Sequence, residues 1–219
     1  ETITELIKKQ DLPAAGIING TAQIRDLNTN MTFNADINVT DLEAFGQPVG
    51  NVTAKLLNSS AENINADVKL TGNNNDLSLV GNYNTKASAF DMDLNINRLE
   101  MNTIQGFTMN MIHDTEGHIS GQLDIKGSID EPQIRGQMKF NQVGLTLKEY
   151  GSNFRNIDDA IDFTSKGIEF NRFRINDNDG NTLTLNGDIL TKNYSDFDFD
   201  LTANGRDFKV INSEESADA

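Results

Sequence analysis

The two histidines are the first residues to consider for a chemical site. His113 and His118 stand close to Asp114 and Glu116, and such a group could hold a small metal site. A structural zinc site needs four well-placed ligands, and the histidine spacing differs from that of a zinc-peptidase helix. The alternative is a hairpin turn with Gly117 at its hinge. We expect the turn and no metal ion.

A second candidate is the acidic stretch Asp177-Asn178-Asp179-Gly180. A calcium loop of the EF-hand type carries a glycine at position six and acidic ligands at positions one and twelve. With Gly180 at position six, those two places fall on Ile175 and Asn186, and neither is acidic. We therefore expect an acidic turn, without calcium and without any cofactor.

Paired carboxylates are frequent, but they do not indicate an enzyme. Asp91 and Asp93, like Asp198 and Asp200, alternate with apolar residues, which places them on a solvated sheet face. A glycosidase would hold two carboxylates in a cleft. The chain has no cysteine, no nucleophile elbow, no phosphate-binding loop and no dinucleotide fingerprint. We predict no catalytic residues and a protein that is not an enzyme.

The charge of the chain excludes further classes. Its 219 residues include 18 basic and 33 acidic side chains, a net charge of −15. Such a chain lacks the basic surface that binds nucleic acid or anionic membranes. No apolar run approaches the roughly 20 residues of a membrane-spanning helix. The chain opens at Glu1 rather than Met, so we expect a processed chain or a piece of a longer protein, with any membrane anchor outside it.

Apolar and polar residues alternate along most of the chain, which predicts strands with one apolar and one polar face. Short turns separate the runs, for example residues 73–75, 116–117, 130–132 and 176–181, and this favours antiparallel pairing. The predicted strands are residues 33–39, 64–70, 90–96, 119–125, 134–140, 143–147, 161–163, 168–170, 183–189 and 197–203.

Helix is scarce in this pattern. Residues 1–10 read as a short helix, residues 156–161 as a single helical turn, and residues 213–219 as a disordered tail. With so few helices, the apolar sheet face must be covered in another way. It can pack on a second sheet, curl on itself, or hold an apolar ligand. Alternation alone leaves these three possibilities open.

The order of several motifs resembles a known family. Gly117, Gly121 and the run from Asp130 to Gly136 are followed by Tyr150-Gly151-Ser152-Asn153, and then by Asp179-Gly180-Asn181 and Asn186-Gly187-Asp188. This order is similar to the C-terminal region of the TamB family, the inner-membrane subunit of the translocation and assembly module, within the AsmA-like group. Upstream, the run from Phe45 to Asn51, Leu79-Val80-Gly81-Asn82-Tyr83, and Leu12-Pro13 with Gly16 and Gly20 resemble the Bacteroidota members.

The resemblance implies an all-β fold, in which a long, mainly antiparallel twisted sheet folds into a U-shaped β-taco with an apolar groove. We expect a first taco segment in residues 1–115, with the N-terminal helix, and a second in residues 116–212. Family members lie in the periplasm, anchored in the inner membrane. They are implicated in transporting phospholipid to the outer membrane and in assembling outer-membrane proteins with a barrel partner of the TamA type.

We therefore interpret the chain as part of an envelope-spanning protein that guides phospholipid, or nascent outer-membrane β-strands, along this groove. The candidate groove residues alternate in the last predicted strands: Leu183, Leu185, Ile189, Phe197, Phe199 and Leu201. The alternative is an extracellular adhesion or sugar-binding β-sandwich, which would show a closed dry core and an exposed aromatic platform. A hydrolase is a third reading and would show a cleft with paired carboxylates.

Overall fold

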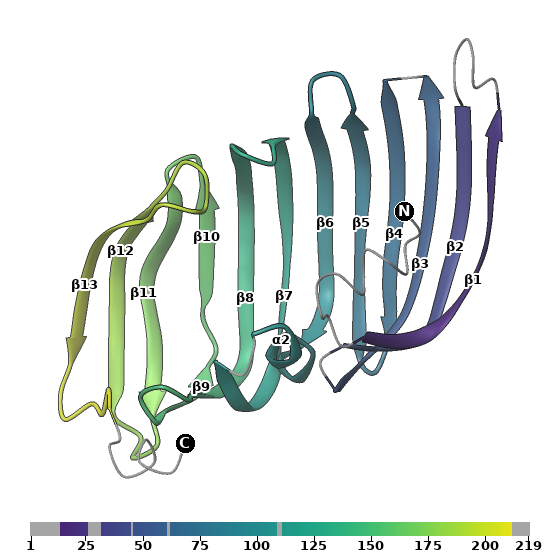
Figure 1. The fold of residues 1–219 in the computed structure, drawn as a ribbon. Helices are drawn as coiled ribbons and strands as arrows, with labels where there is room; N and C mark the ends of the chain where they lie inside the picture. The colour runs from purple at the N-terminus through teal and green to yellow at the C-terminus, as the bar shows by residue number, and fades with distance from the viewer. Residues whose placement is uncertain (1–13, 26–31, 45, 61, 109–110, 212–219) are drawn as a thin grey trace.

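A computed structural model describes residues 14–25, 32–44, 46–60, 62–108 and 111–211 of the chain. These residues form one continuous antiparallel sheet of 13 strands with a single short helix beside it (Figure 1). The predicted all-β, mainly antiparallel architecture is confirmed. The predicted helix over residues 1–10 and the predicted tail over residues 213–219 lie outside the described residues.

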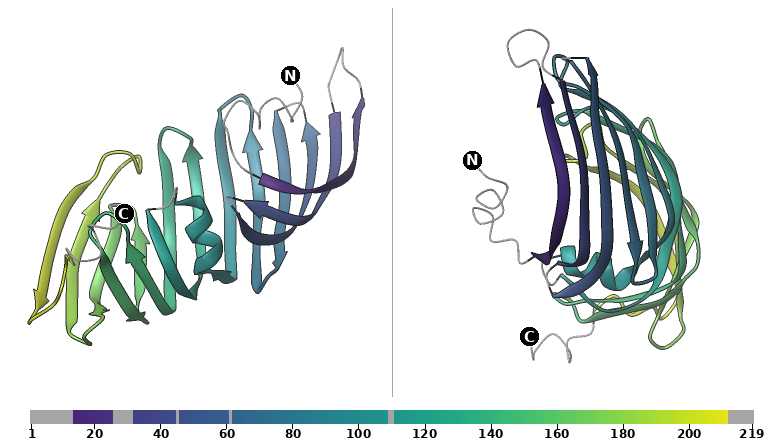
Figure 2. Two further views of the ribbon diagram at one scale, coloured as in Figure 1. Left: turned by 60° about the horizontal axis from the view of Figure 1, so that its bottom comes forward. Right: turned by 90° about the vertical axis from the view of Figure 1, so that its right-hand side faces the viewer.

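The strands follow one another across the sheet nearly in chain order. They are β1 (Ala14–Arg25), β2 (Thr32–Ala44), β3 (Gln47–Ser60), β4 (Asn63–Gly72), β5 (Asn75–Asn84), β6 (Ala89–Glu100), β7 (Ile112–Ser128), β8 (Pro132–Leu147), β9 (Ser152–Ile157), β10 (Ala160–Thr164), β11 (Gly167–Asp177), β12 (Thr182–Leu190) and β13 (Asp198–Gly205). The long strands curve, so the sheet forms a trough (Figure 2). In the described part of the chain β1 and β13 are the two edges of the sheet, and they do not pair with each other.

β9 and β10 share the space between β8 and β11. β9 pairs with the lower part of β8, and β10 pairs with β8 above it. Between them the backbone N–H of Phe140 donates to the carbonyl of Asp159 (2.9 Å). The helical turn predicted for residues 156–161 is therefore wrong. Both flanking segments are extended, because ladder bonds to two neighbouring strands replace the local bonds of a turn.

The helix α2 (Met101–Phe107) joins β6 to β7 and was not predicted from the sequence. It lies within the curve of the sheet, near the lower ends of the strands (Figures 1 and 2). Met101 and Ile104 pack into the main apolar cluster. The buried Asn75 side chain fixes the start of the helix: its Nδ2 donates to Thr103 Oγ1 (2.8 Å) and to the Val49 carbonyl (2.8 Å), and its Oδ1 accepts the N–H of Glu100 (2.8 Å).

The hairpin turn predicted at Gly117 is also wrong. β7 continues through this position, and its pairing with β8 shifts register on both sides of Glu116. Asp114 and Gly117 have positive φ values of 50° and 77°. The residues that tolerate left-handed backbone form bulges within a long strand here. The turns predicted at residues 73–75, 130–132 and 176–181 do connect consecutive strands.

The division predicted between residues 115 and 116 falls inside β7. The two-segment organisation of residues 1–115 and 116–212 thus remains a prediction. Among the described residues, no helix has the length and apolar character needed to cross a lipid bilayer.

Candidate functional site: an apolar trough

The concave face of the sheet is apolar from one edge to the other. Directly paired residues of an antiparallel sheet share a face, so a row of pairs can be followed across the molecule. The first row takes one residue from every strand except β9: Ile18, Val39, Val52, Leu70, Leu77, Ile96, Gly121, Met138, Ile161, Phe170, Gly187 and Leu201. Every member of this row, called row A below, is apolar or glycine.

A second row, called row B below, runs parallel to row A on the same face. It consists of Gly20, Ile37, Ala54, Val68, Leu79, Leu94, Leu123, Gly136, Phe163, Ile168, Ile189 and Phe199. Again no polar side chain interrupts it. The two rows form an apolar floor along the whole trough.

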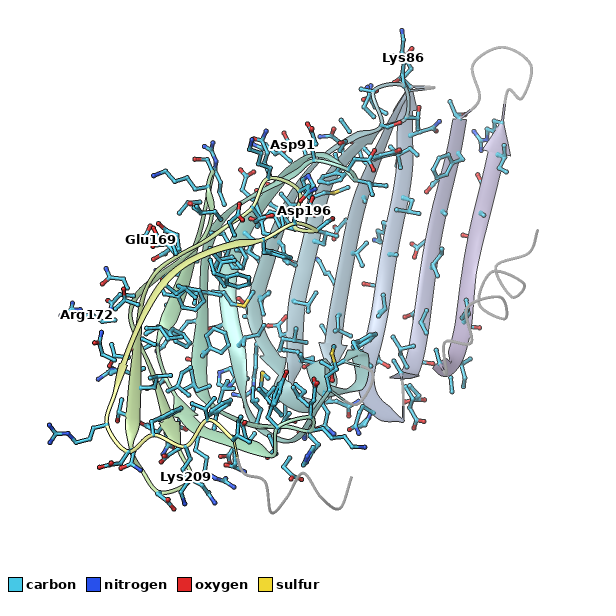
Figure 3. The ribbon with its side chains drawn as sticks, turned by 60° about the vertical axis from the view of Figure 1, so that its left-hand side comes forward. Lys86, Asp91, Glu169, Arg172, Asp196 and Lys209 are labelled. Atoms are coloured by element: carbon cyan, nitrogen blue, oxygen red, sulfur yellow. The ribbon has the colours of Figure 1, made fainter. Side chains whose placement is uncertain are left out.

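The residues between these rows point to the opposite, convex face, and all of them are polar. This row is Asn19, Asn38, Thr53, Lys69, Ser78, Asn95, Gln122, Gln137, Asp162, Glu169, Asp188 and Asp200. Figure 3 shows Glu169 and Arg172 pointing away from the curved sheet. The contrast between the two faces follows directly from the period-two pattern of the sequence.

The apolar floor is only partly shielded. Ile96 and Ile161 are buried in the main cluster, whereas Met138 and Phe163 are half-buried. Toward β13 the floor opens further, and Phe199 is 70% exposed. Among the described residues no second sheet lies over this face. The trough therefore presents an apolar surface that remains accessible from one side.

The six predicted groove residues can now be placed. Leu183, Leu185 and Ile189 lie half-buried on the concave face of β12, and their partners in β13 include Phe199 and Ala203. Leu201 belongs to row A, and Phe199 to row B. Phe197 precedes β13, and its side chain is 43% exposed. The structure thus brings five of the six onto one face, and their role in binding lipid remains a prediction.

Sequence reasoning found only the C-terminal end of this surface. The members of rows A and B in β2 to β8 come from the same alternating runs, but only strand pairing shows that they are continuous. The partners of Asn75 were also missed, because residues 49, 75 and 103 meet only in the folded chain. No local signal in the sequence identifies this network.

The C-terminal residues that follow β13 cross the lower ends of β12, β11 and β9. The Asp177 carboxylate, which is 3% exposed, accepts N–H bonds from Asp179, Asn181 and Lys209. The ring of Phe208 stacks on Phe154 with 6.0 Å between centroids. This segment and α2 both lie at the lower rim of the trough, so the upper rim is the more open one.

The Asp177 carboxylate thus joins the C-terminal segment to the turn between β11 and β12. Burial acts to raise the pKa of Asp177, but the N–H bonds from Lys209, Asn181 and Asp179 outweigh it and lower the pKa below its usual value. Each carboxylate oxygen faces N–H donors. The prediction that this stretch binds no calcium is not tested by this geometry.

A second carboxylate with a lowered pKa, that of Asp159, lies at the break between β9 and β10. The Arg174 guanidinium donates to both oxygens of Asp159, at 3.0 Å each, and lowers the pKa of Asp159. The backbone N–H of Arg174 donates to the same carboxylate (2.9 Å). This fork holds β11 against the interruption between the two short strands.

The histidines do not converge on a common site. His113 Nδ1 lies 2.8 Å from Asp114 Oδ2, whereas His118 is paired across the ladder with Asn141. Burial, together with the nearby charge of Arg98, lowers the pKa of His118. Within the described residues, no three or more acidic or histidine side chains are grouped as a metal would require.

The model of the TamB C-terminal domain matches residues 65–167 and 171–218. No curated protein and no solved structure matches the chain. The family match extends over well more than half of the sequence and includes the strands from β5 to β13. The chain therefore belongs to the TamB family, whose members act in biogenesis of the cell envelope.

Proposed function

We propose that the apolar trough carries the acyl chains of phospholipids between the inner and outer membranes. The observation that supports this most strongly is the continuity of rows A and B, which leave no polar side chain on the floor from β1 to β13. A path for acyl chains needs such continuity, whereas an ordinary core needs it only where a second layer packs.

The energetics of this surface suit transport. Burial of each acyl CH₂ group is worth about 0.8 kcal/mol, so a chain can be held without any polar contact. Because neighbouring rows are chemically alike, a chain can move along the floor without meeting a charged barrier. A nascent outer-membrane β-strand with one apolar face is a second possible cargo, and the exposed edges β1 and β13 favour it.

In this proposal the chain acts in the periplasm, as part of a protein anchored in the inner membrane through a segment outside residues 1–219. A barrel partner of the TamA type would receive the cargo at the outer membrane. The rival adhesion or sugar-binding module requires a closed sandwich core. The described residues instead form a single sheet with one open apolar face.

Mass spectrometry of organic extracts tests the proposal. The purified chain should carry phospholipid, or should take it up from vesicles and retain it through size-exclusion chromatography. A closed β-sandwich of similar size, purified from the same cells, is the control and should carry none. Absence of lipid from the chain before and after incubation with vesicles would contradict the proposal.

A further inference from the structure

A line of β-bulges crosses the sheet below row A. In β2, β6 and β11 the regular ladder ends at the row A residue, and each strand then inserts one extra residue relative to the strand that follows it in the chain. In β2, for example, Thr40 and Asp41 lie opposite Asn51 alone on β3. Further bulges in β7, β8 and β9 continue the line a few residues lower.

Above row A the ladder is almost free of such interruptions. Among the described residues, the one register shift on that side lies at the far end of β3, beside Asn58. A bulge bends its strand and increases the local twist, so a row of bulges bends the whole sheet along one line. This line of bulges, called the crease below, separates an upper wall that carries row B from a lower wall on which α2 packs (Figure 2).

The bulges contain residues in a backbone conformation that side chains disfavour. Five non-glycine residues, each within the bulge of a different strand, have φ values between 50° and 52°: Asp41, Asp114, Gln142, Asn156 and Arg172. Such left-handed residues persist only where the surrounding structure holds them in place. The crease therefore needs bonds that fix its bulges.

Side-chain amides of the neighbouring strands supply such bonds. A bulge leaves a backbone N–H outside the ladder, and that donor needs another acceptor. In β11 the N–H of Arg172 donates to Asn186 Oδ1 on β12 (2.9 Å). In β2 the N–H of Asp41 donates to Asn51 Oδ1 on β3 (3.0 Å). The same arrangement thus occurs near both edges of the sheet.

Two further side chains hold the strands directly below their bulges. Asn75 Oδ1 accepts the N–H of Glu100 at the end of β6 (2.8 Å). Asp159 Oδ2 accepts the N–H of Arg174 in β11 (2.9 Å). The bulged strands β2, β6 and β11 are therefore each tied to another strand or connection through a side-chain oxygen.

The bend at the crease determines how the upper wall stands relative to the lower one. The buried members of the main apolar cluster all lie on row A or below it: Ile96, Met101, Ile119, Val143, Ile157, Ile161 and Phe173. Among the described residues no second sheet packs on the upper wall. Packing therefore does little to set the angle of this wall, and the bulges must set it.

We propose that Asn51 and Asn186 are positioning residues, which fix the crease and hold the trough open at the width of acyl chains before lipid arrives. This inference rests on the proposed function and adds to it the device that preforms the binding surface. A preformed site loses less conformational freedom on binding than one that must first bend. Neither residue belongs to row A or row B, so each acts without touching the lipid.

The absence of cysteine from the chain allows two spin labels to report the bend. Lys166→Cys and Asn178→Cys place labels in the turns at the upper and lower ends of β11, and double electron–electron resonance measures the distance between them. In this background Asn186→Leu should shift the distribution to longer distances, because the N–H of Arg172 loses its acceptor. Asn186→Asp keeps an oxygen at that place and should keep the original distribution.

Binding of dioctanoyl phosphatidylcholine below its micelle concentration is the second measurement, made by isothermal titration calorimetry on unlabelled protein. Asn186→Leu should bind this lipid about tenfold more weakly, the loss expected when about two acyl CH₂ groups leave the floor. Asn51→Leu, near the other edge of the sheet, should weaken binding likewise and keeps the test intact if Asn186→Leu does not fold. The matched control Asn95→Leu alters an exposed convex residue of the regular ladder and should bind as wild type does. Circular dichroism establishes which variants are folded.

The outcomes separate this inference from the proposed function. If wild type binds lipid but Asn186→Leu keeps the original distance, or changes it without weaker binding, Asn186 does not position the trough and only the proposed function stands. Equal weakening in Asn186→Asp or Asn95→Leu would also overturn the role of the amide oxygen. If wild type binds no lipid, the proposed function fails and the positioning role fails with it.

Discussion

Individual buried polar residues hold this open sheet together. Asn75 is 3% exposed and uses both ends of its amide to join β3, β5 and the start of α2. A sheet with one solvated face and one open face has few fully buried apolar residues, and Val143 is the only large one below 2% exposure in the described chain. Polar connections of this kind therefore contribute a large share of the local stability.

Replacement of Asn75 by alanine should lower the free energy of unfolding by about 2–3 kcal/mol, because the Val49 carbonyl, the Thr103 hydroxyl and the Glu100 N–H lose their partner. Urea denaturation measures this loss. The control Asn82→Ala changes an exposed residue of the same strand and should cost less than about 0.5 kcal/mol. Equal losses in the two variants would show that the Asn75 network is unimportant.

Asp177 should make stability depend on acid. Its pKa is lowered in the folded chain, so its contribution is present above the unfolded value of about 3.9 and is lost as pH falls through the folded pKa. Wild type should lose stability below about pH 4, and Asp177→Asn should be less stable at pH 7 and flatter in this acid range. The exposed Asp130→Asn should follow wild type. If wild type and Asp177→Asn show the same dependence of stability on pH, the Asp177 carboxylate does not stabilise the fold.

At the scale of elements, the close approach of β12 and β13 depends on a glycine. Gly187 has a φ of +117°, and a Cβ there would overlap the carbonyl oxygen of Asp200. The strand pair must separate to accept any side chain at this place in row A. Gly180 has a φ of +84° but open space around its Cβ position. The two glycines therefore separate the effect of backbone strain from that of crowding.

Gly187→Ala should destabilise the chain by about 1–3 kcal/mol more than Gly180→Ala does, since only the first adds an overlap to the strain of a positive φ. Thermal melts of the two variants make the comparison, and amide hydrogen exchange should locate the additional loss in β12 and β13. If both variants have the same melting temperature, the close approach of the strands at Gly187 does not restrict the residue at that position.

β13 also tests whether the floor is open. Phe199→Glu places a carboxylate at the exposed end of row B, so the fold should survive with a loss of less than about 1 kcal/mol, while bound lipid falls because a charge beside acyl chains is costly to desolvate. Asn204→Glu adds the same charge to the other face of β13 and should leave lipid unchanged. Melting and co-purified lipid are measured on both. If Phe199→Glu unfolds and the wild type carries no lipid, Phe199 belongs to an ordinary hydrophobic core.

At the scale of the whole molecule, the sequence predicts most of the sheet. Alternation is a local signal, so runs such as residues 90–96 give both the strand and the face of each side chain. Alternation does not predict the helix α2. Its seven residues include Thr103, Ile104 and Gly106, which favour helix weakly, and no side-chain cap starts it. Packing of Gly106 on β2 and β3, and the Asn75 network, supply what the local sequence lacks.

The site is predictable only in part, for the same reason. Alternation predicts that five of the candidate groove residues share one face, and the structure places them there: Leu183, Leu185, Ile189, Phe199 and Leu201. The continuity of rows A and B depends on strand register, which is set by residues far apart in the chain.

Photo-crosslinking tests the central claim, that the concave face holds acyl chains along its length. The protein is loaded with a phospholipid that carries a diazirine in its acyl chain, irradiated and digested, and the adducts are located by mass spectrometry. Adducts should concentrate on members of rows A and B, such as Leu94, Phe163 and Leu201, and should be rare on the convex neighbours Asn95 and Asp162. Equal labelling of both faces, or labelling confined to β1 and β13, would contradict a lipid path through this trough.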